Sequence, residues 1–385
     1  MNLTHNKKIK ISLADYPYKK DISNRLFLEN LSAFEIKTLH ELFYFGTKFP
    51  LSDLAEALDC APNTLLPLLD NFSRTGLLLQ QEDMIFVDKD LRKYFESQME
   101  VFDETFEPDL EYFQKLLKKA PISTLPVWYN IPKTSDNIFS SIVEKYLYTP
   151  KLYEKHINEL VFDEPLCRTI LDLLFAEPSL TIHAKTVRDT LSISREKFQE
   201  CMLLLEFHVA CASSFVFDGT SWVEVVVPFK EYKDLCLHDK KHKPQVITAK
   251  VHPFEPSSNG AEPFSLFRAG IDALQNEFGA AFGSAEKSVR EIEKACRNLP
   301  ANSWMALDDC INWITAAVGN QEPLALKKVG KKWQYTLPNY SQKEKEFIKR
   351  VITDLFFNMN VTECGTYNNT LCFKITPFGR MTLGD

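Results

Sequence analysis

The sequence predicts a mainly α fold with small β-hairpins, and three observations support this class. Glycine is scarce, with 12 among 385 residues, which favours helices over glycine-rich loops. Apolar residues such as Phe34, Leu39 and Leu42 recur at helical spacing. Paired runs of strand-forming residues follow groups of helices at three places, near 77–87, 211–227 and 361–375.

The first group of elements begins with a capped helix. Ser32 and Glu35 have the spacing of a capping box, which places a helix start at Ser32. A short helix over 52–58 follows, and Pro62 suits the first turn of a third helix. The runs LLLQ and MIFV, separated by QED, then predict a two-stranded hairpin. Three helices and a hairpin, in this order, are typical of a winged helix-turn-helix.

The same order returns twice. After Asp163 come three helical segments and a hairpin with Asp218-Gly219 at its turn. The third copy has a helix over 303–318, an inserted basic segment, a long helix over 341–360 and the hairpin ECGTYNNTLC. The predicted fold is therefore three winged helix-turn-helix units joined by helical spacers. Its segments are unit 1 with an N-terminal arm over 1–100, a helical spacer over 101–160, unit 2 over 161–238, a linker over 239–263, and a helical segment with unit 3 over 264–385.

No pattern for catalysis or cofactor binding is recognisable. The segment Gly279–Ser288 loosely resembles a phosphate-binding loop, but three residues separate its glycines and no strand precedes it. Ser284 fits better as the cap of the next helix. The sequence also lacks His-Glu-x-x-His, Gly-x-Ser-x-Gly and dinucleotide-binding patterns. We therefore expect a protein that is not an enzyme and binds no cofactor.

The nine cysteines do not have the spacing of a metal site. Cys364 and Cys372 are separated by seven residues, whereas zinc sites use two to four. A turn centred on Asn368 would place the two thiols face to face, which is the arrangement of a disulfide. The odd count and the absence of an export signal instead predict reduced, metal-free thiols and a cytoplasmic location. No apolar stretch of 18 residues predicts a membrane span.

Charge distinguishes the three units. The chain has a net charge of -7, and the first two units, counted over 32–96 and 163–236, are each at -5. Over 322–351 the balance reverses to +5, and basic residues beside aromatic ones are typical of phosphate and base contacts. The alternative is a purely structural role, in which the hairpin is solvated and Trp333 lies in the core. The candidate nucleic-acid-binding residues are Lys327, Lys328, Lys331, Lys332, Trp333, Lys349, Arg350, Lys374 and Arg380, with Arg195 and Lys197 in unit 2.

Several stretches of the sequence resemble those of a known protein family. The stretches LPANSWMALDDCINWI, VITDLFFNMNVTECG and FKITPFGRMTL resemble the bacterial winged-helix module associated with xeroderma-pigmentosum-B-type helicases. In that module a Leu-Thr-Pro-Leu-Gly-Arg-like phrase ends the domain, and residues 375–380, Ile-Thr-Pro-Phe-Gly-Arg, match it here. The resemblance implies a tandem winged-helix protein. Because no helicase motor is present, it also implies that any DNA-linked activity comes from a partner.

Two functions from different classes remain open at this point. The first is a tandem winged-helix protein acting in a nucleic-acid context, whose C-terminal unit contacts DNA or RNA while the acidic N-terminal units hold partner proteins. The alternative is a protein-interaction scaffold that binds no nucleic acid, which the net charge favours.

Overall fold

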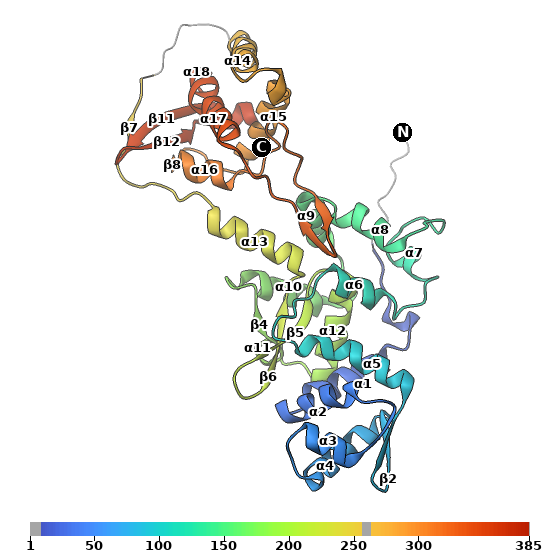
Figure 1. The fold of residues 1–385 in the computed structure, drawn as a ribbon. Coiled ribbons are helices and arrows are strands. Elements are labelled where there is room, and N and C mark those ends of the chain that lie inside the picture. The colour runs from blue at the N-terminus through green and yellow to red at the C-terminus, as the bar shows by residue number, and fades with distance from the viewer. Residues whose placement is uncertain (1–8, 256–262, 385) are drawn as a thin grey trace. The chain divides into compact units, whose positions relative to one another are not determined.

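The computed structural model describes residues 9–255 and 263–384. Helices make up 54% of the structure, and the strands form small antiparallel sheets. The predicted class, mainly α with small β-hairpins, is therefore confirmed (Figure 1).

The chain divides into two compact units. Unit 1 contains Met1–Lys145 and Glu154–Lys233, and unit 2 contains Tyr146–Tyr153 and Asp234–Asp385. The five segments expected from the sequence remain a prediction. Residues 1–8 of the expected arm and 256–262 of the expected linker lie outside the described residues.

Within these two units, one order of elements occurs three times: a helix, a short strand, two further helices and a hairpin. The first module, in unit 1, contains α2 (Ala33–Tyr44), β1 (Lys48–Pro50), α3 (Leu51–Ala57), α4 (Pro62–Arg74), β2 (Leu78–Gln81) and β3 (Met84–Val87). Ser32 caps α2 in the predicted capping box, and Pro62 occupies the first turn of α4. The core of this module contains the fully buried Leu39, Phe72 and Ile85.

The second module also lies in unit 1. It contains α10 (Pro165–Ala176), β4 (Ile182–His183), α11 (Ala184–Leu191), α12 (Arg195–Phe207), β5 (Ala212–Phe217) and β6 (Trp222–Val227). In both modules of unit 1 the short first strand pairs with the last strand, giving the orders β1-β3-β2 and β4-β6-β5. The sequence predicted only the two hairpin strands. The strands β1 and β4 have three and two residues, too few for a period-2 pattern to show.

The remaining helices of unit 1 are α1 (Tyr18–Glu29), α5 (Lys89–Met99), α6 (Leu110–Leu117), α7 (Leu125–Trp128), α8 (Ile138–Ile142) and most of α9 (Pro150–Glu159). The helix α13 (Lys230–His242) begins in unit 1 and continues into unit 2. Among the contacts of these helices, α1 packs against α12.

Unit 2 contains the third module together with further helices and strands. Its elements are β7 (His252–Pro253), α14 (Pro263–Phe278), α15 (Ala285–Cys296), β8 (Met305–Ala306), α16 (Leu307–Trp313), β9 (Leu326–Val329), β10 (Lys332–Tyr335), α17 (Gln342–Arg350), α18 (Phe356–Asn358), β11 (Thr362–Tyr367), β12 (Thr370–Ile375) and α19 (Pro377–Leu383). The sheet order is β7-β11-β12-β8, and β9 and β10 form a separate hairpin inserted between α16 and α17. A π-helical turn, Val351–Leu355, joins α17 to α18.

One local expectation for unit 2 was wrong. The helix predicted over 303–318 is shorter, because α16 ends at Trp313 and the chain turns to extended backbone at Ile314. The hydroxyl of Tyr340 donates to the carbonyls of Ile314 and Ala316, at 3.2 and 2.6 Å, and so replaces helical hydrogen bonds there.

The two cysteines of the last hairpin do not face each other. Its turn has two residues, Asn368 and Asn369, both with positive φ, as a type I′ turn requires. Cys364 therefore pairs with Phe373, and Cys372 pairs with Gly365. Because this register differs by one residue from a turn centred on Asn368, the two thiols point to opposite faces of the hairpin.

Candidate nucleic-acid interface

The inserted hairpin β9–β10 carries the four lysines that the sequence singled out. Gly330, with φ +64°, begins its two-residue turn, and Lys331 completes it. In an antiparallel pair, residues directly opposite each other share a face. Lys328 lies opposite Trp333, and Lys327 lies opposite Gln334. The lysines are therefore divided between the two faces and the turn of the hairpin.

One face of this hairpin packs on the segment Tyr146–Tyr153 of the same unit. The amide of Leu326 donates to the carbonyl of Tyr148 at 2.8 Å, and the hydroxyl of Tyr335 donates to the carbonyl of Leu147 at 2.7 Å. Trp333 shares this face and is partly buried. An indole in this position is less accessible for stacking on a base than the sequence implied.

The lysines at the tip remain accessible. Lys328, Lys331 and Lys332 are exposed, and within residues 9–255 and 263–384 the side chains of these three lysines have no hydrogen bond or ion pair. Lys327, by contrast, forms an ion pair with Glu322. Three cations on a short inserted hairpin are an arrangement suited to contacting phosphates, which need positive charge but no particular side-chain geometry.

The predicted residues of α17 are engaged with neighbouring acids. Arg350 forms ion pairs with Asp354 at 2.8 Å and with Glu277 and Glu346 at 3.6 Å. Lys349 lies 3.9 Å from Glu346. The helix α14 packs on the π-helical turn that follows α17, because Gly270 lies directly against Leu355. Both basic side chains at the C-terminal end of α17 are therefore already paired with carboxylates of the same unit.

Lys374 and Arg380 make structural contacts beside the last hairpin. Lys374 pairs with Glu363 across the β11–β12 hairpin at 3.0 Å, and its ammonium lies 5.3 Å from the ring centre of Trp304. Arg380 donates to the carbonyls of Arg297 and Leu299 at 2.6 and 3.2 Å. Both side chains thus connect elements of unit 2.

In the second module, Arg195 and Lys197 also have partners within the chain. Arg195 donates to the side chain of Asn30 at 2.6 Å. Lys197 lies 2.5 Å from Glu164, and the pair lowers the pKa of that carboxyl and raises the pKa of the lysine. The helix that carries them, α12, is buried from Phe198 almost to its end, so it offers no free face to a groove.

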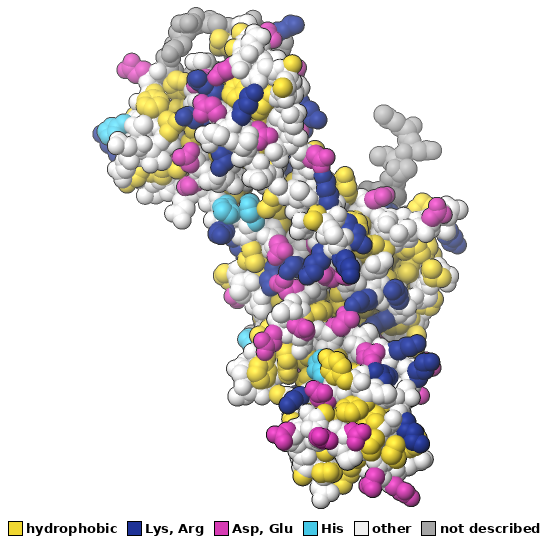
Figure 2. Space-filling view, in the orientation of Figure 1, with side chains coloured by type: hydrophobic (Ala, Val, Ile, Leu, Met, Phe, Trp, Pro, Cys, Tyr) yellow, Lys and Arg dark blue, Asp and Glu magenta, His cyan; other side chains and the backbone are white. Residues whose placement is uncertain are grey.

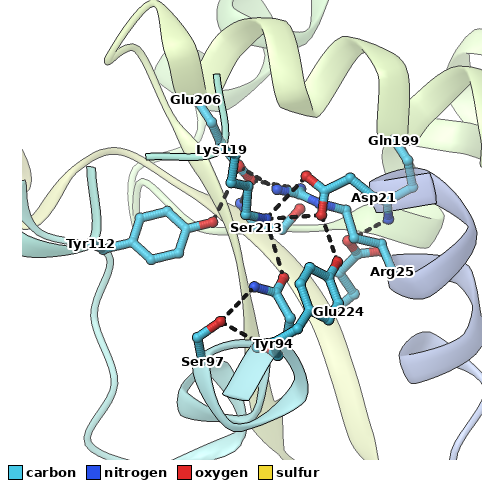
Figure 3. Close-up of polar contacts among 11 residues, drawn as sticks. Asp21, Arg25, Tyr94, Ser97, Tyr112, Lys119, Gln199, Glu206, Ser213 and Glu224 are labelled. Atoms are coloured by element: carbon cyan, nitrogen blue, oxygen red, sulfur yellow. Dashed lines mark hydrogen bonds and ion pairs between the residues drawn. The ribbon is translucent and has the colours of Figure 1, made fainter. Parts of the chain in front are cut away.

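A buried network of charges holds α1 on α12. Arg25 donates to both carboxylate oxygens of Glu206, at 2.9 and 2.6 Å, and Glu206 is fully buried. Tyr112 donates to the same carboxylate at 3.1 Å, and burial together with this charge raises the pKa of the phenol. Lys119 reaches Asp21 at 2.8 Å. Figure 3 shows these side chains converging from α1, α6, α12 and, for Lys119, the segment that follows α6.

The sequence did not predict this network, because no local sequence pattern indicates it. Arg25 and Glu206 are 181 residues apart. Each looks like an ordinary surface charge in its own segment, and only the packing of α1 on α12 removes both from water.

The third helix of the first module, α4, has an exposed surface, but this surface is not basic. On α4, Pro62, Asn63, Thr64 and Leu66 are exposed. The helix carries one base, Arg74, which is paired with Asp70 at 2.7 Å. Figure 2 shows acidic side chains gathered over α3, α4 and β2. The negative charge of this surface repels a polyanion.

The two units differ in net charge. Counted over the sequence, unit 1 carries 25 Lys and Arg against 35 Asp and Glu, a net of -10. Unit 2 carries 20 against 17, a net of +3. Any contact with a polyanion is therefore favoured on unit 2.

Comparisons with protein families, curated proteins and solved structures found no match to this chain. In residues 9–255 and 263–384, no helix has the length and apolar character needed to cross a bilayer. Over the same ranges, no three His, Cys, Asp or Glu side chains are grouped as a metal site would require.

Proposed function

We propose that this chain is a non-enzymatic tandem winged-helix protein that contacts the phosphate backbone of nucleic acid through the β9–β10 hairpin. The observation that carries the proposal is the set of exposed lysines near its tip, Lys328, Lys331 and Lys332, whose ammonium groups have no partner among the described residues. The winged-helix assignment is supported by the three modules and by the pairing of each short first strand with the last hairpin strand.

The contact is with phosphates rather than with base edges. A winged helix normally reads sequence with its third helix in the major groove. Here α12 is largely buried, Lys349 and Arg350 of α17 are paired with acids, and α4 carries a single, paired arginine. Lysines on a hairpin position a nucleic acid without specifying its sequence. Unit 1, with its net charge of -10, is the part that holds partner proteins.

The test is the salt dependence of binding to mixed-sequence duplex DNA, single-stranded DNA and RNA. In the variant Lys328→Ala/Lys331→Ala/Lys332→Ala, the slope of log affinity against log salt should flatten by about 2 to 3 units on duplex DNA. Sequence preference should not change. The matched control removes three exposed lysines of unit 1, Lys89→Ala/Lys93→Ala/Lys118→Ala, and should keep the slope of the parent protein.

A second candidate function is a scaffold that binds proteins only. The exposed, uncharged face of α4 and the acidic side chains around it favour this function for unit 1. If the parent protein binds none of the three nucleic acids even at low salt, the scaffold replaces the nucleic-acid proposal for the whole chain.

A further inference from the structure

The strand β5, in the second module, lies at the edge of its sheet. Within the described residues it pairs with β6 alone, so its other side is an open edge. The amide of Ser213 donates to the carboxylate of Glu206 at 3.3 Å and therefore points away from β6. In an antiparallel ladder the backbone groups of every second residue point the same way, which directs those of Phe215 and Phe217 to the edge. In the described parts of the chain, these two residues form no backbone hydrogen bond with another segment.

A pocket of unit 1 reaches this edge. Its volume is about 390 Å³, which is within the range of ligand sites. The pocket is lined by four consecutive residues of β5, Ser214 to Phe217, and by residues of the segment 104–108. Neighbouring residues of a strand point to opposite faces, so a pocket that touches four in a row extends along the edge. The rings of Phe102 and Phe215 lie with their centres 4.3 Å apart, which holds the segment 104–108 near β5.

Most of the side chains that line the pocket are apolar. Val225 lies opposite Ser214 in the ladder, so Val216, Val225 and Val227 share one face of the sheet. Val216 is 50% exposed there. A ligand that covers it would gain the free energy of removing apolar surface from water.

The charged side chains of the pocket balance one another. Lys230 and Lys233, in the first turn of α13, both pair with Glu107, and Lys233 lies 3.7 Å from it. Glu104 is the fourth charged residue of the lining. Two lysines and two glutamates give no preference for an anionic or a cationic ligand. Recognition therefore depends on the apolar walls and on the backbone groups of the edge.

We propose that this pocket and the edge of β5 bind an extended peptide segment of a partner protein. The segment adds a strand to the sheet β4-β6-β5 and places one apolar side chain in the pocket. An extended backbone presents an N–H and a C=O at every second residue, which is the spacing of those of Phe215 and Phe217. Backbone hydrogen bonds then supply affinity, and the pocket selects the side chain. The inference rests on the part of the proposed function in which unit 1 holds a partner protein.

The first experiment locates the site. The probe is a phage-displayed library of random peptides of about ten residues, selected on the full chain, and the enriched peptides are synthesised for measurement of their dissociation constants. These peptides should share an apolar residue at one position. Val216→Lys places an ammonium group at the pocket and should weaken binding by about 10-fold or more, because the peptide would bury the charge. Leu79→Lys is the matched control, since Leu79 is a strand residue of the first module that is 56% exposed, and it should bind as the parent does.

The second experiment tests the addition of a strand. Methylating one backbone nitrogen of the peptide at a time removes a hydrogen-bond donor and keeps every side chain. In an added strand only every second amide faces β5. Methylation should therefore weaken binding by about 10-fold at alternate positions and have little effect at the positions between them.

Three outcomes overturn the inference: no peptide is enriched, Val216→Lys binds the peptides as the parent does, or the effects of methylation do not alternate. None of these outcomes affects the proposed contact with nucleic acid, because the three-lysine variant of β9–β10 tests that contact separately. Conversely, a parent protein that binds no nucleic acid but binds the peptides in the expected way retains the inference and overturns the nucleic-acid proposal.

Discussion

At the scale of single residues, burial decides what a charge does in this protein. Arg25 and Glu206 have side chains that are 11% and 0% exposed, whereas those of Arg74 and Asp70 are 75% and 65% exposed. Both are Arg–carboxylate pairs with oxygen–nitrogen distances near 2.7 Å. The two pairs differ in the stability that is lost when one partner is removed, because a buried charge left without its partner cannot be hydrated by water.

Arg25→Met should therefore lower the free energy of unfolding of unit 1 by about 3 to 5 kcal/mol. Glu206 would keep its hydrogen bonds from Tyr112 and the amide of Ser213, but no cation would neutralise it. Arg74→Met is the matched control and should change stability by no more than about 0.5 kcal/mol. Urea unfolding of both variants checks the prediction, and equal effects would contradict it.

The buried carboxyl of Glu224 makes the stability of the fold depend on pH. Burial, with a smaller contribution from Glu29, raises the pKa of Glu224 from 4.5 to about 7. Folding therefore takes up a proton between these values, and the stabilising contribution of the group is lost as the pH rises through about 7. Glutamine keeps an oxygen for the amide of Gln199, which donates to Glu224 at 2.8 Å, but it does not ionise.

The stability of Glu224→Gln relative to the parent should thus increase by about 2 to 3 kcal/mol between about pH 5 and pH 8. Denaturant unfolding at both pH values measures this difference. The exposed Glu82→Gln serves as the control and should show no such trend. A constant difference for Glu224→Gln across the pH range would show that the buried carboxyl does not titrate as described.

At the scale of elements, residues 375–380, which resemble the end of the helicase-associated module, are explained by the way α19 is capped and packed. The side chain of Thr376 caps α19 by accepting from the amide of Gly379 at 2.7 Å, and its hydroxyl donates to the carbonyl of Asn360 at 2.6 Å. Pro377 occupies the first turn of the helix. A Cβ atom at Gly379 would collide with the backbone of Val361, so the glycine permits close contact between α19 and β11.

Gly379→Ala should accordingly destabilise unit 2 by about 1 to 3 kcal/mol or more, because backbone rather than a flexible side chain blocks the added methyl group. Gly46→Ala is a suitable control, since the nearest atom to its Cβ would be 4.0 Å away. Thermal unfolding distinguishes the two. A neutral Gly379→Ala would mean that α19 can move away from β11 at little cost.

At the scale of the whole molecule, each unit contains a hydrophobic core made only of its own residues. One core consists of residues from Leu274 to Leu383, all in unit 2, and another of residues from Leu28 to Phe102, all in unit 1. Units with cores of their own can unfold as separate cooperative transitions.

Calorimetry of the parent should therefore show two transitions. Arg25→Met should lower the temperature of only one of them, and Gly379→Ala should lower only the other. A single transition shifted by both variants would show that the units unfold together. The same pair of variants identifies which transition belongs to which unit without separating the chain.

The sequence by itself determined the class of fold, the positions of the three hairpins and several helix ends, because these depend on residues close together in the chain. The capping box of Ser32 and Glu35 and the proline at the start of α4 are examples. The basic hairpin was also visible as a local excess of lysine, although its division into two faces was not.

Only the tertiary structure decided which of the candidate residues are accessible. The packing of α1 on α12, and the pairing of Arg195, Lys197 and Arg350, depend on contacts between distant segments. Whether a charged side chain faces water or a partner is a property of packing, since its local sequence is the same in both cases. Among the candidates, Lys328, Lys331 and Lys332 of β9–β10 became the main ones because their side chains are exposed. Lys327, the fourth candidate lysine of this hairpin, is instead paired with Glu322.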